Sequence, residues 1–517
     1  MKMNFRKIIS GIAASVMIFA VSAPAFSAYA EGEEVLSDGN LQFQYIDGGV
    51  EIIGCNDSVT ELNIQEHLNG FSIIEISESA FANCSKLEKV TLPNTIKKID
   101  SAAFMNCYSL QTINIPESVE TLGDCVFQNC YLLQSVEMNA KVQSIPTGTF
   151  YNCQMLTEID IPESVTYIGA SAFDNCCTLE NVEIPDAVTM IDAYAFRNCY
   201  VISKLNLPSK ITGIGGGAFI NCFNLSEITL AEDNSAYAVE NNILYDKQKT
   251  TILASAPVAI TGEVEIPRSV KTIQQYAFAG CTEMKSVTIP EGMSKIEEGT
   301  FSYCSGLTEV IVPEGVTEIG VLAFSYCDKL EKIKLPTTLS TIGSAAFCFD
   351  GALKEIEFFG ALVKVADGAF LNCVLLNEVT IPKNVEEIGN YAFGFKSNES
   401  GEAAILIDDF KMNVSSGSAA EKYAKTNGIK YEVIDKGLKK VIFIVICAGA
   451  AILIVVIAIV IIRKGNKKPE NETEKPDEEE EIDDEDYVGI LSDDEENVNE
   501  KSASAEDKVI EDESEKE

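Results

Sequence analysis

A phenylalanine recurs at a fixed interval along most of this chain, and that interval limits the possible folds more than any other feature. Successive members are 23 residues apart at every step except one, which is 59 residues. A fixed period of this length is typical of solenoids, in which each unit packs only against its neighbours. The members are Phe81, Phe104, Phe127, Phe150, Phe173, Phe196, Phe219, Phe278, Phe301, Phe324, Phe347, Phe370 and Phe393. We therefore expect about thirteen stacked coils with a column of phenylalanine rings through their core.

The residues between two phenylalanines follow one pattern. Counted from the Phe, Asn-Cys comes two and three residues later, Leu six, Val or Ile nine, Ile or Leu eleven, and Pro twelve. The segment Leu-x-x-Val-x-Ile predicts a short strand with one apolar face, and the proline ends it because proline has no N–H for a ladder. A second apolar pair, Val165 and Ile168 in one unit, is expected to turn back into the core.

Both ends of the repeats, residues 80–395, carry segments that predict caps. Residues 31–79 contain an alternating stretch, a turn at Asp47–Gly48 and a second apolar stretch, which is typical of a β-hairpin. Residues 396–436 predict a short helix followed by a strand, with Ser418 and Glu421 as a capping box and Gly428 as the stop. Caps of this kind cover the apolar ends of a solenoid.

The motifs Leu-x-x-Val-x-Ile-Pro, Val-x-x-Ile-Gly and Ala-Phe-x-Asn-Cys resemble the BspA-like leucine-rich repeats of bacterial surface proteins, over roughly residues 41–434. The long step, an insertion at about residues 231–260, is similar to the hairpin-bearing unit of that family, and residues 416–431 are similar to its C-terminal cap. The expected fold is therefore an α/β-type repeat solenoid, a right-handed leucine-rich-repeat superhelix with short parallel strands. The resemblance also implies an adhesin that binds host matrix proteins or other cells.

The two ends of the chain predict that the protein is located at the cell membrane. Residues 1–30 combine a basic start, an apolar run and Ala28-Tyr29-Ala30, as a cleaved signal peptide does. Residues 441–462 contain no charged side chain and predict one transmembrane helix, with the heavier basic flank after it. Residues 463–517 are strongly acidic and predict a disordered cytoplasmic tail. We expect a single-pass protein with its repeats outside the cell.

The net charge of the chain limits the classes of molecule that could be its partner. The chain has 39 Lys and Arg residues against 79 Asp and Glu, which gives a formal net charge of −40. Nucleic acids and anionic membrane surfaces would be repelled, whereas basic partners would be attracted. We therefore expect the partner to be an extracellular protein or a cell-surface ligand, and we expect no nucleic-acid partner.

The sequence provides little for catalysis. His67 is the only histidine, and there is no Cys-x-x-Cys, glycine-rich phosphate loop or His-Glu-x-x-His motif. We expect no enzyme activity, no metal site and no cofactor. Eleven of the sixteen cysteines share one column of the repeat, where side chains point the same way, so we expect free thiols. These are Cys84, Cys107, Cys130, Cys153, Cys176, Cys199, Cys222, Cys281, Cys304, Cys327 and Cys373.

The outward positions of the strands, eight and ten residues after each Phe, provide the candidate ligand-binding residues. These are Glu137, Glu158, Asp160, Asn181 and Glu183 in an acidic run, and Lys332 and Lys334 further along. We interpret the protein as a membrane-anchored surface module that binds a macromolecular partner. Two alternatives remain: an envelope spacer without a specific ligand, and a receptor that signals through residues 487–490 of its tail.

Overall fold

The computed structural model describes residues 35–435 apart from 399 and 402. The expected signal peptide, transmembrane helix and acidic tail lie outside the described residues. Between residues 35 and 435, no helix is both long and apolar enough to cross a membrane.

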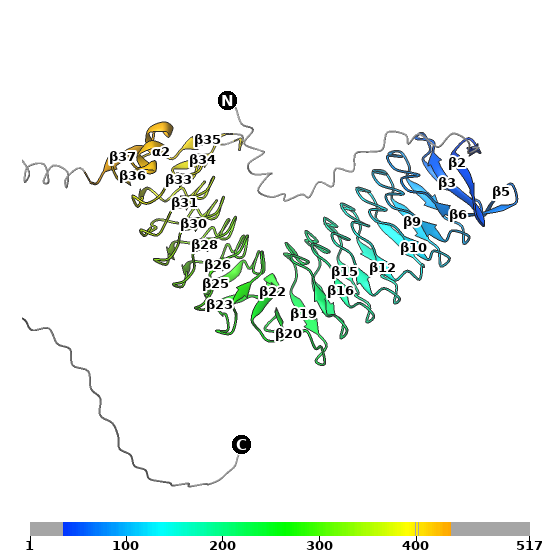
Figure 1. Cartoon of the computed structure of the whole chain (residues 1–517), viewed down its shortest axis with the longest axis horizontal. Helices are drawn as coiled ribbons and strands as arrows, with labels where there is room; N and C mark the ends of the chain where they lie inside the picture. The colour runs from blue at the N-terminus through cyan, green and yellow to red at the C-terminus, as the bar shows by residue number, and fades with distance from the viewer. Residues whose placement is uncertain (1–34, 399, 402, 436–517) are drawn as a thin grey trace, which may run out of the picture. The chain divides into compact units, whose positions relative to one another are not determined.

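Most coils contribute a short strand about nine residues after their Phe, and these strands pair in parallel (Figure 1). The coil of Phe347 contributes only an isolated bridge, in which Glu355 pairs with Lys332. Partners lie one repeat apart, as in Val136↔Ile159 and Ile159↔Val182. The 23-residue period is therefore the spacing of the coils. We call these the face strands: β4 (Glu61–Asn63), β7 (Lys89–Thr91), β9 (Thr112–Ile115), β11 (Ser135–Met138), β13 (Glu158–Ile159), β15 (Asn181–Val182), β17 (Lys204–Leu207), β19 (Glu227–Leu230), β23 (Thr261–Glu265), β25 (Glu283–Thr288), β27 (Glu309–Ile311), β29 (Lys332–Lys334), β32 (Glu378–Thr380), β36 (Lys411–Val414) and β37 (Lys430–Val433).

A second column of parallel strands, which the sequence pattern did not predict as strands, forms where the chain turns back. It holds the second apolar pair of each unit, so that Ile168 lies beside Ile145 and Ile191. These return strands are β6 (Phe71–Ile76), β8 (Lys98–Ile99), β10 (Thr121–Leu122), β12 (Ser144–Ile145), β14 (Tyr167–Ile168), β16 (Met190–Ile191), β18 (Gly213–Ile214), β22 (Thr251–Ser255), β24 (Thr272–Ile273), β26 (Lys295–Ile296), β28 (Glu318–Ile319), β30 (Thr341–Ile342), β31 (Lys364–Val365) and β33 (Glu387–Ile388).

Proline and glycine shape the coil between the two columns. Pro162 follows β13, and its carbonyl accepts the N–H of Val165 at 2.9 Å, which closes a tight turn. Gly169 follows β14 and lies against the preceding coil, where an added Cβ would stand 2.6 Å from the backbone nitrogen of Thr147. Only glycine permits so close an approach of two backbones.

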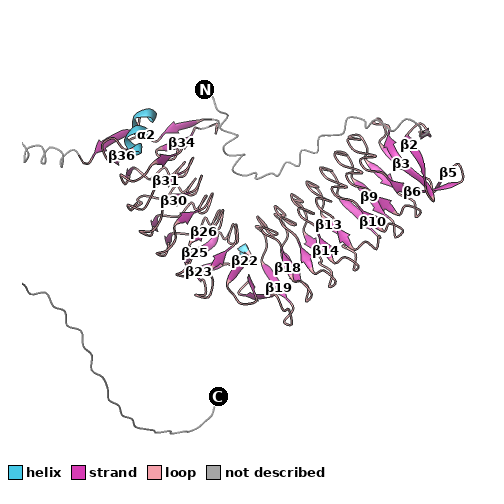
Figure 2. Cartoon of the chain, in the orientation of Figure 1, coloured by secondary structure: helices cyan, strands magenta, loops and turns pink. Residues whose placement is uncertain are grey.

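The α/β-type class expected from the sequence is corrected to a β-solenoid. Strands and turns make up nearly all of the described chain, whose helices are α2 (Ala419–Asn427) and the short 3-10 helix η1 (Pro257–Ala259) (Figure 2). Neither connects face strands within a regular coil. Each regular coil turns instead through residues in the left-handed region, such as Asn175 at φ 63°, and a helix cannot pass through that conformation.

The phenylalanine column forms the centre of the core. Twelve of the thirteen rings are buried, and Phe219 is half-buried. Neighbouring rings stack with centroids 4.7–5.9 Å apart and planes within 15° of parallel. The column stops at Phe219 and starts again at Phe278, and the buried residues form two clusters that meet at this point. The long step in the sequence is thus a break in the core.

The caps and the insertion contain most of the antiparallel pairs. At the N-terminal end, β2 (Leu41–Ile46) and β3 (Gly49–Cys55) form a hairpin. β1 (Leu36–Ser37) pairs with β2, and β5 (His67–Leu68) pairs with the return strand β6. In the insertion, β20 (Tyr237–Glu240) pairs with β21 (Ile243–Asp246), which pairs with the return strand β22.

The C-terminal end combines a hairpin with the helix α2. The hairpin is β34 (Phe395–Ser397) with β35 (Ala404–Leu406). Ser418 caps α2 by accepting the N–H of Glu421, whose carboxylate accepts the N–H of Gly417 at 2.6 Å. Gly428 ends the helix at φ 70°, and β37 then adds the last face strand.

Candidate ligand-binding site

The acidic run predicted from the sequence lies on the exposed side of the face strands. Glu137, Glu158, Asp160, Asn181 and Glu183 are all exposed. Glu158 lies in register between Ser135 and Asn181, so these residues occupy neighbouring coils of one sheet. In the part of the chain that the structure describes, none of the four carboxylates forms an ion pair. The run is therefore an acidic surface that no lysine or arginine of the described chain neutralises.

The two candidate lysines belong to a different sheet, so the structure does not bring them to the acidic run. Lys332 and Lys334 lie on β29 and are exposed. Lys332 stands between Glu309 and Glu355 in register, with its Nζ 3.9 Å from Glu309 Oε1. Alternating signs on adjacent strands attract, which gives Lys332 a structural role.

A cavity of about 360 Å³ lies where the coils before the insertion meet those after it. That volume falls in the range of about 300–1,000 Å³ that is usual for ligand pockets. An unbroken series of ring contacts runs along it: Tyr200–Phe223 at 5.9 Å, Phe223–Tyr303 at 5.6 Å, Tyr303–Tyr326 at 4.7 Å and Tyr326–Phe349 at 4.5 Å. We call it the aromatic cavity, lined by these five rings together with Tyr194, Arg197, Asn221, Gln275, Tyr276, Glu298 and Ser302.

Three of these rings occupy backbone positions that suit asparagine far better. Two residues after the Phe, the backbone is left-handed in coil after coil, and Asn fills this position seven times before the insertion. These amides form a ladder with Nδ2–Oδ1 distances of 2.8–2.9 Å. Beyond the insertion, Tyr303 and Tyr326 take the position at φ 59° and 60°, and Phe349 takes it at φ 69°.

Aromatic residues with left-handed backbone therefore concentrate at the aromatic cavity. Six aromatic residues in the described chain have positive φ, and all but Tyr391 line this cavity. A bulky residue in the left-handed region costs about 1–3 kcal/mol, and such residues cluster at functional sites. Asparagine at the same positions would avoid most of this cost.

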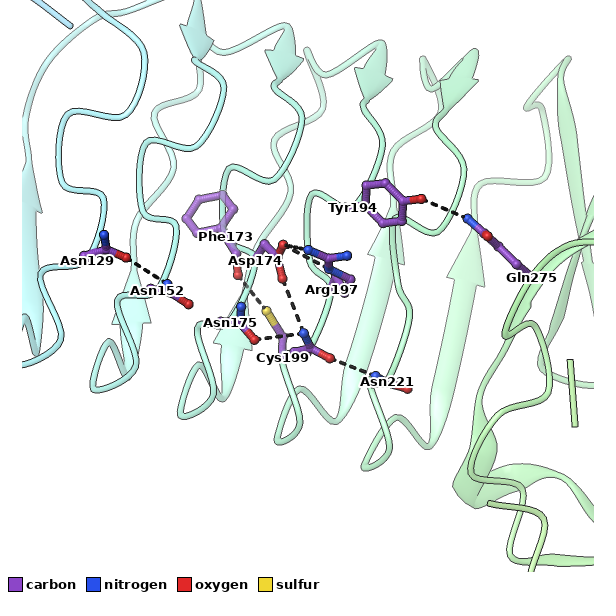
Figure 3. A network of polar contacts seen from close by, with 11 residues as sticks. Asn129, Asn152, Phe173, Asp174, Asn175, Tyr194, Arg197, Cys199, Asn221 and Gln275 are labelled. Atoms are coloured by element: carbon purple, nitrogen blue, oxygen red, sulfur yellow. Dashed lines mark hydrogen bonds and ion pairs between the residues drawn. The ribbon is translucent and has the colours of Figure 1, made fainter. Parts of the chain in front are cut away.

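A buried ion pair supports one wall of the cavity (Figure 3). Asp174 is fully buried, and Arg197 Nε donates to its Oδ2 at 2.9 Å. Burial raises the pKa of Asp174, and the hydrogen bond from Arg197 opposes that shift. The guanidinium carbon also lies 4.6 Å from the centroid of the Tyr194 ring. The ion pair with Asp174, which has no net charge, thus holds Arg197 against the Tyr194 ring.

Polar contacts also link the two sides of the cavity. Gln275 Nε2 donates to the hydroxyl of Tyr194 at 3.2 Å, across 81 residues of sequence (Figure 3). The Tyr276 hydroxyl donates to Glu298 Oε1 at 2.9 Å. Burial, followed by the charge of Glu298, raises the pKa of Tyr276, so its phenol stays protonated at neutral pH. Glu298 therefore faces a hydrogen-bond donor that keeps its proton.

The described chain contains no cluster of potential metal ligands. No group of three or more His, Cys, Asp or Glu residues is placed to hold an ion between residues 35 and 435. His67 is exposed on β5, where it pairs with Ser72 of β6. The fifteen described cysteines are all free thiols.

Sequence reasoning missed the aromatic cavity. A usable signal was present, because three consecutive units, those of Phe301, Phe324 and Phe347, replace the column asparagine with an aromatic residue. The other part, Tyr200 and Phe223, could not be joined to them without knowing how the chain crosses the insertion.

Comparisons with known proteins match the geometry. A family model described as a BspA type leucine-rich repeat region, in six copies, matches residues 55–177, 123–251 and 271–400. The crystal structure of a leucine rich cell surface protein from Faecalibacterium prausnitzii is 27% identical, covers 64% of this chain and 96% of that one, and has a TM-score of 0.57. A leucine-rich repeat protein from Bacteroides ovatus is 24% identical, with 77% and 99% covered and a TM-score of 0.44. No curated protein matches the sequence.

Proposed function

The chain belongs to the BspA-type leucine-rich repeat family, and we propose that it is a cell-surface binding protein whose macromolecular partner docks at the aromatic cavity. The concentration of left-handed aromatic residues there carries the proposal. Strain of this kind persists where function requires it. The role is recognition and includes no catalytic step.

The proposal includes anchoring at the cell membrane. Residues 1–30 would direct export, and residues 441–462 would hold the chain in the membrane with the repeats outside. The description of the Faecalibacterium prausnitzii relative as a cell surface protein supports this location.

Attachment of cells that display the full chain tests the proposal. These cells are offered three kinds of surface: one coated with matrix proteins, one coated with glycans, and a layer of other cells. The decisive variant is Tyr303→Asn with Tyr326→Asn, since Asn is the column residue and suits the left-handed backbone. We expect attachment to fall at least tenfold while thermal stability stays equal or rises.

The matched control is Tyr108→Asn with Tyr131→Asn. These exposed rings stack at 5.3 Å but lie outside the cavity, so attachment should not change. If the wild-type chain attaches saturably to none of the surfaces, the envelope spacer without a ligand is the better description. If both double variants attach like the wild type, the partner docks elsewhere on the solenoid.

A further inference from the structure

The aromatic cavity contains hydrogen-bond acceptors that lack donors. The asparagine ladder ends at Asn221, whose Nδ2 donates to Asn198 Oδ1 at 2.8 Å while its own Oδ1 has no partner. Ser302 is 1% exposed, and its hydroxyl oxygen also has no partner. These are two of the three such buried side-chain atoms between residues 35 and 435. A buried polar atom without a partner costs about 1–3 kcal/mol, which a ligand donor could recover.

The cavity also has an unbalanced negative charge. Its one cation, Arg197, is paired with the buried carboxylate of Asp174. Glu298 lines the cavity and accepts one neutral hydroxyl, and no ion pair within the described residues involves it. The chain as a whole is acidic as well, with a formal net charge of −40. Such a field attracts basic partners.

We propose that the aromatic cavity receives an arginine side chain of a basic protein or peptide. A guanidinium is planar, packs against aromatic rings and carries five N–H donors, which suit the carboxylate of Glu298 and the oxygens of Asn221 and Ser302. Lysine offers a compact charge without the planar surface, and a neutral sugar leaves the charge of Glu298 unpaired. The inference rests on the proposed function and adds the chemistry of the partner.

Fluorescence anisotropy with the purified full chain in detergent tests the inference. The probe is a labelled synthetic peptide with three arginines, compared with a lysine version and a citrulline version, which keeps the shape of arginine and loses its charge. We expect the arginine peptide to bind at least tenfold tighter than either. The variant Glu298→Gln should abolish that preference, and it can still accept the Tyr276 hydroxyl, so the fold should persist.

Glu120→Gln is the matched control, because it removes one exposed carboxylate that lies outside both the face strands and the cavity. It should leave the arginine preference unchanged. Equal binding of all three peptides, or equal loss in both variants, would overturn the inference. If cell attachment depends on Tyr303 and Tyr326 but no arginine preference exists, the proposed function stands and the arginine assignment is wrong. If the arginine preference exists but the cells attach to no surface, the arginine assignment stands and the proposed function is wrong.

Discussion

The thiol of Cys199 donates a hydrogen bond to the carbonyl oxygen of Phe173, 3.2 Å away in the preceding coil. Nine cysteines of the column make this contact, at 3.0–3.3 Å. It explains why the column holds cysteine, because the thiol is small enough for a fully packed core and still satisfies a buried carbonyl group. Each coil is thus joined to the last through both a ring and a thiol.

Phe173→Ala should lower the free energy of unfolding by about 3–5 kcal/mol, as truncation of a buried Phe does. Phe173 is fully buried and stacks on both sides, at 5.3 and 5.1 Å. Denaturant unfolding of residues 31–436 measures the loss. The comparison is Phe219→Ala, which should cost less because that ring is half-buried and stacks on one side only, with Phe196. Equal costs would contradict the core described above.

Asp350→Cys should stabilise the solenoid by about 1–3 kcal/mol at pH 7. Asp350 occupies the cysteine column and is fully buried, with Oδ1 accepting the N–H of Cys327 at 2.9 Å and Oδ2 unpartnered in the described chain. Burial raises its pKa well above the ordinary value of 3.8. A thiol would instead donate to the carbonyl of Phe324, as in neighbouring coils.

The gain should depend on pH. Because the folded pKa of Asp350 exceeds the unfolded one, its contribution is fully present below about pH 4 and is lost as pH rises toward the folded pKa. The advantage of Asp350→Cys should therefore be smaller at pH 4 than at pH 7, which thermal unfolding at the two values would show. A gain that does not vary with pH would mean that the carboxyl group is not the cause.

Alkaline solution should destabilise the repeats through the thiol column. Burial raises the pKa of Cys222 from 9.0 to about 12, so the folded thiol keeps a proton that the unfolded thiol loses. Its contribution is complete below pH 9 and declines between pH 9 and 12, by at most about 1.4 kcal/mol per pH unit. Cys222→Ala should start less stable at pH 7 and show a shallower decline. An unchanged slope would exclude this thiol as a source.

The acidic run on the face strands offers a second surface for a basic partner. Replacing Glu158 with Gln, Asp160 with Asn and Glu183 with Gln should weaken attachment to such a partner and flatten its salt dependence. The melting temperature should stay the same or rise, because like charges on adjacent strands repel. Attachment at two salt concentrations measures the effect. Unaltered attachment would point to the aromatic cavity instead.

The expected topology can be tested on intact cells. Added protease should remove the repeats and spare an epitope placed after Lys468, because the heavier basic flank of residues 441–462 predicts a cytoplasmic C-terminus. Immunoblotting before and after permeabilisation is the measurement. Digestion of the epitope in intact cells would reverse the orientation.

The sequence by itself determined the repeat, its core column and the outline of its caps. Each coil packs against residues one period away, so the same local choices recur: Phe173 for the core, Pro162 to end a strand, Gly169 for the close approach. Ser418 and Gly428 mark the ends of α2 through local hydrogen bonds and backbone conformation, which short patterns also specify. Contacts of this kind can be predicted from the sequence of a single repeat or a single helix.

Only the tertiary structure decided how the chain crosses the insertion. Phe223 and Tyr303 are 80 residues apart in the sequence, and their rings meet at 5.6 Å because the insertion sets the first coils against the later ones there. No period encodes that contact, and none places the unpartnered oxygens of Asn221 and Ser302 in one cavity. The return strands were also hidden, because two residues per coil become a sheet only when neighbouring coils supply the hydrogen bonds.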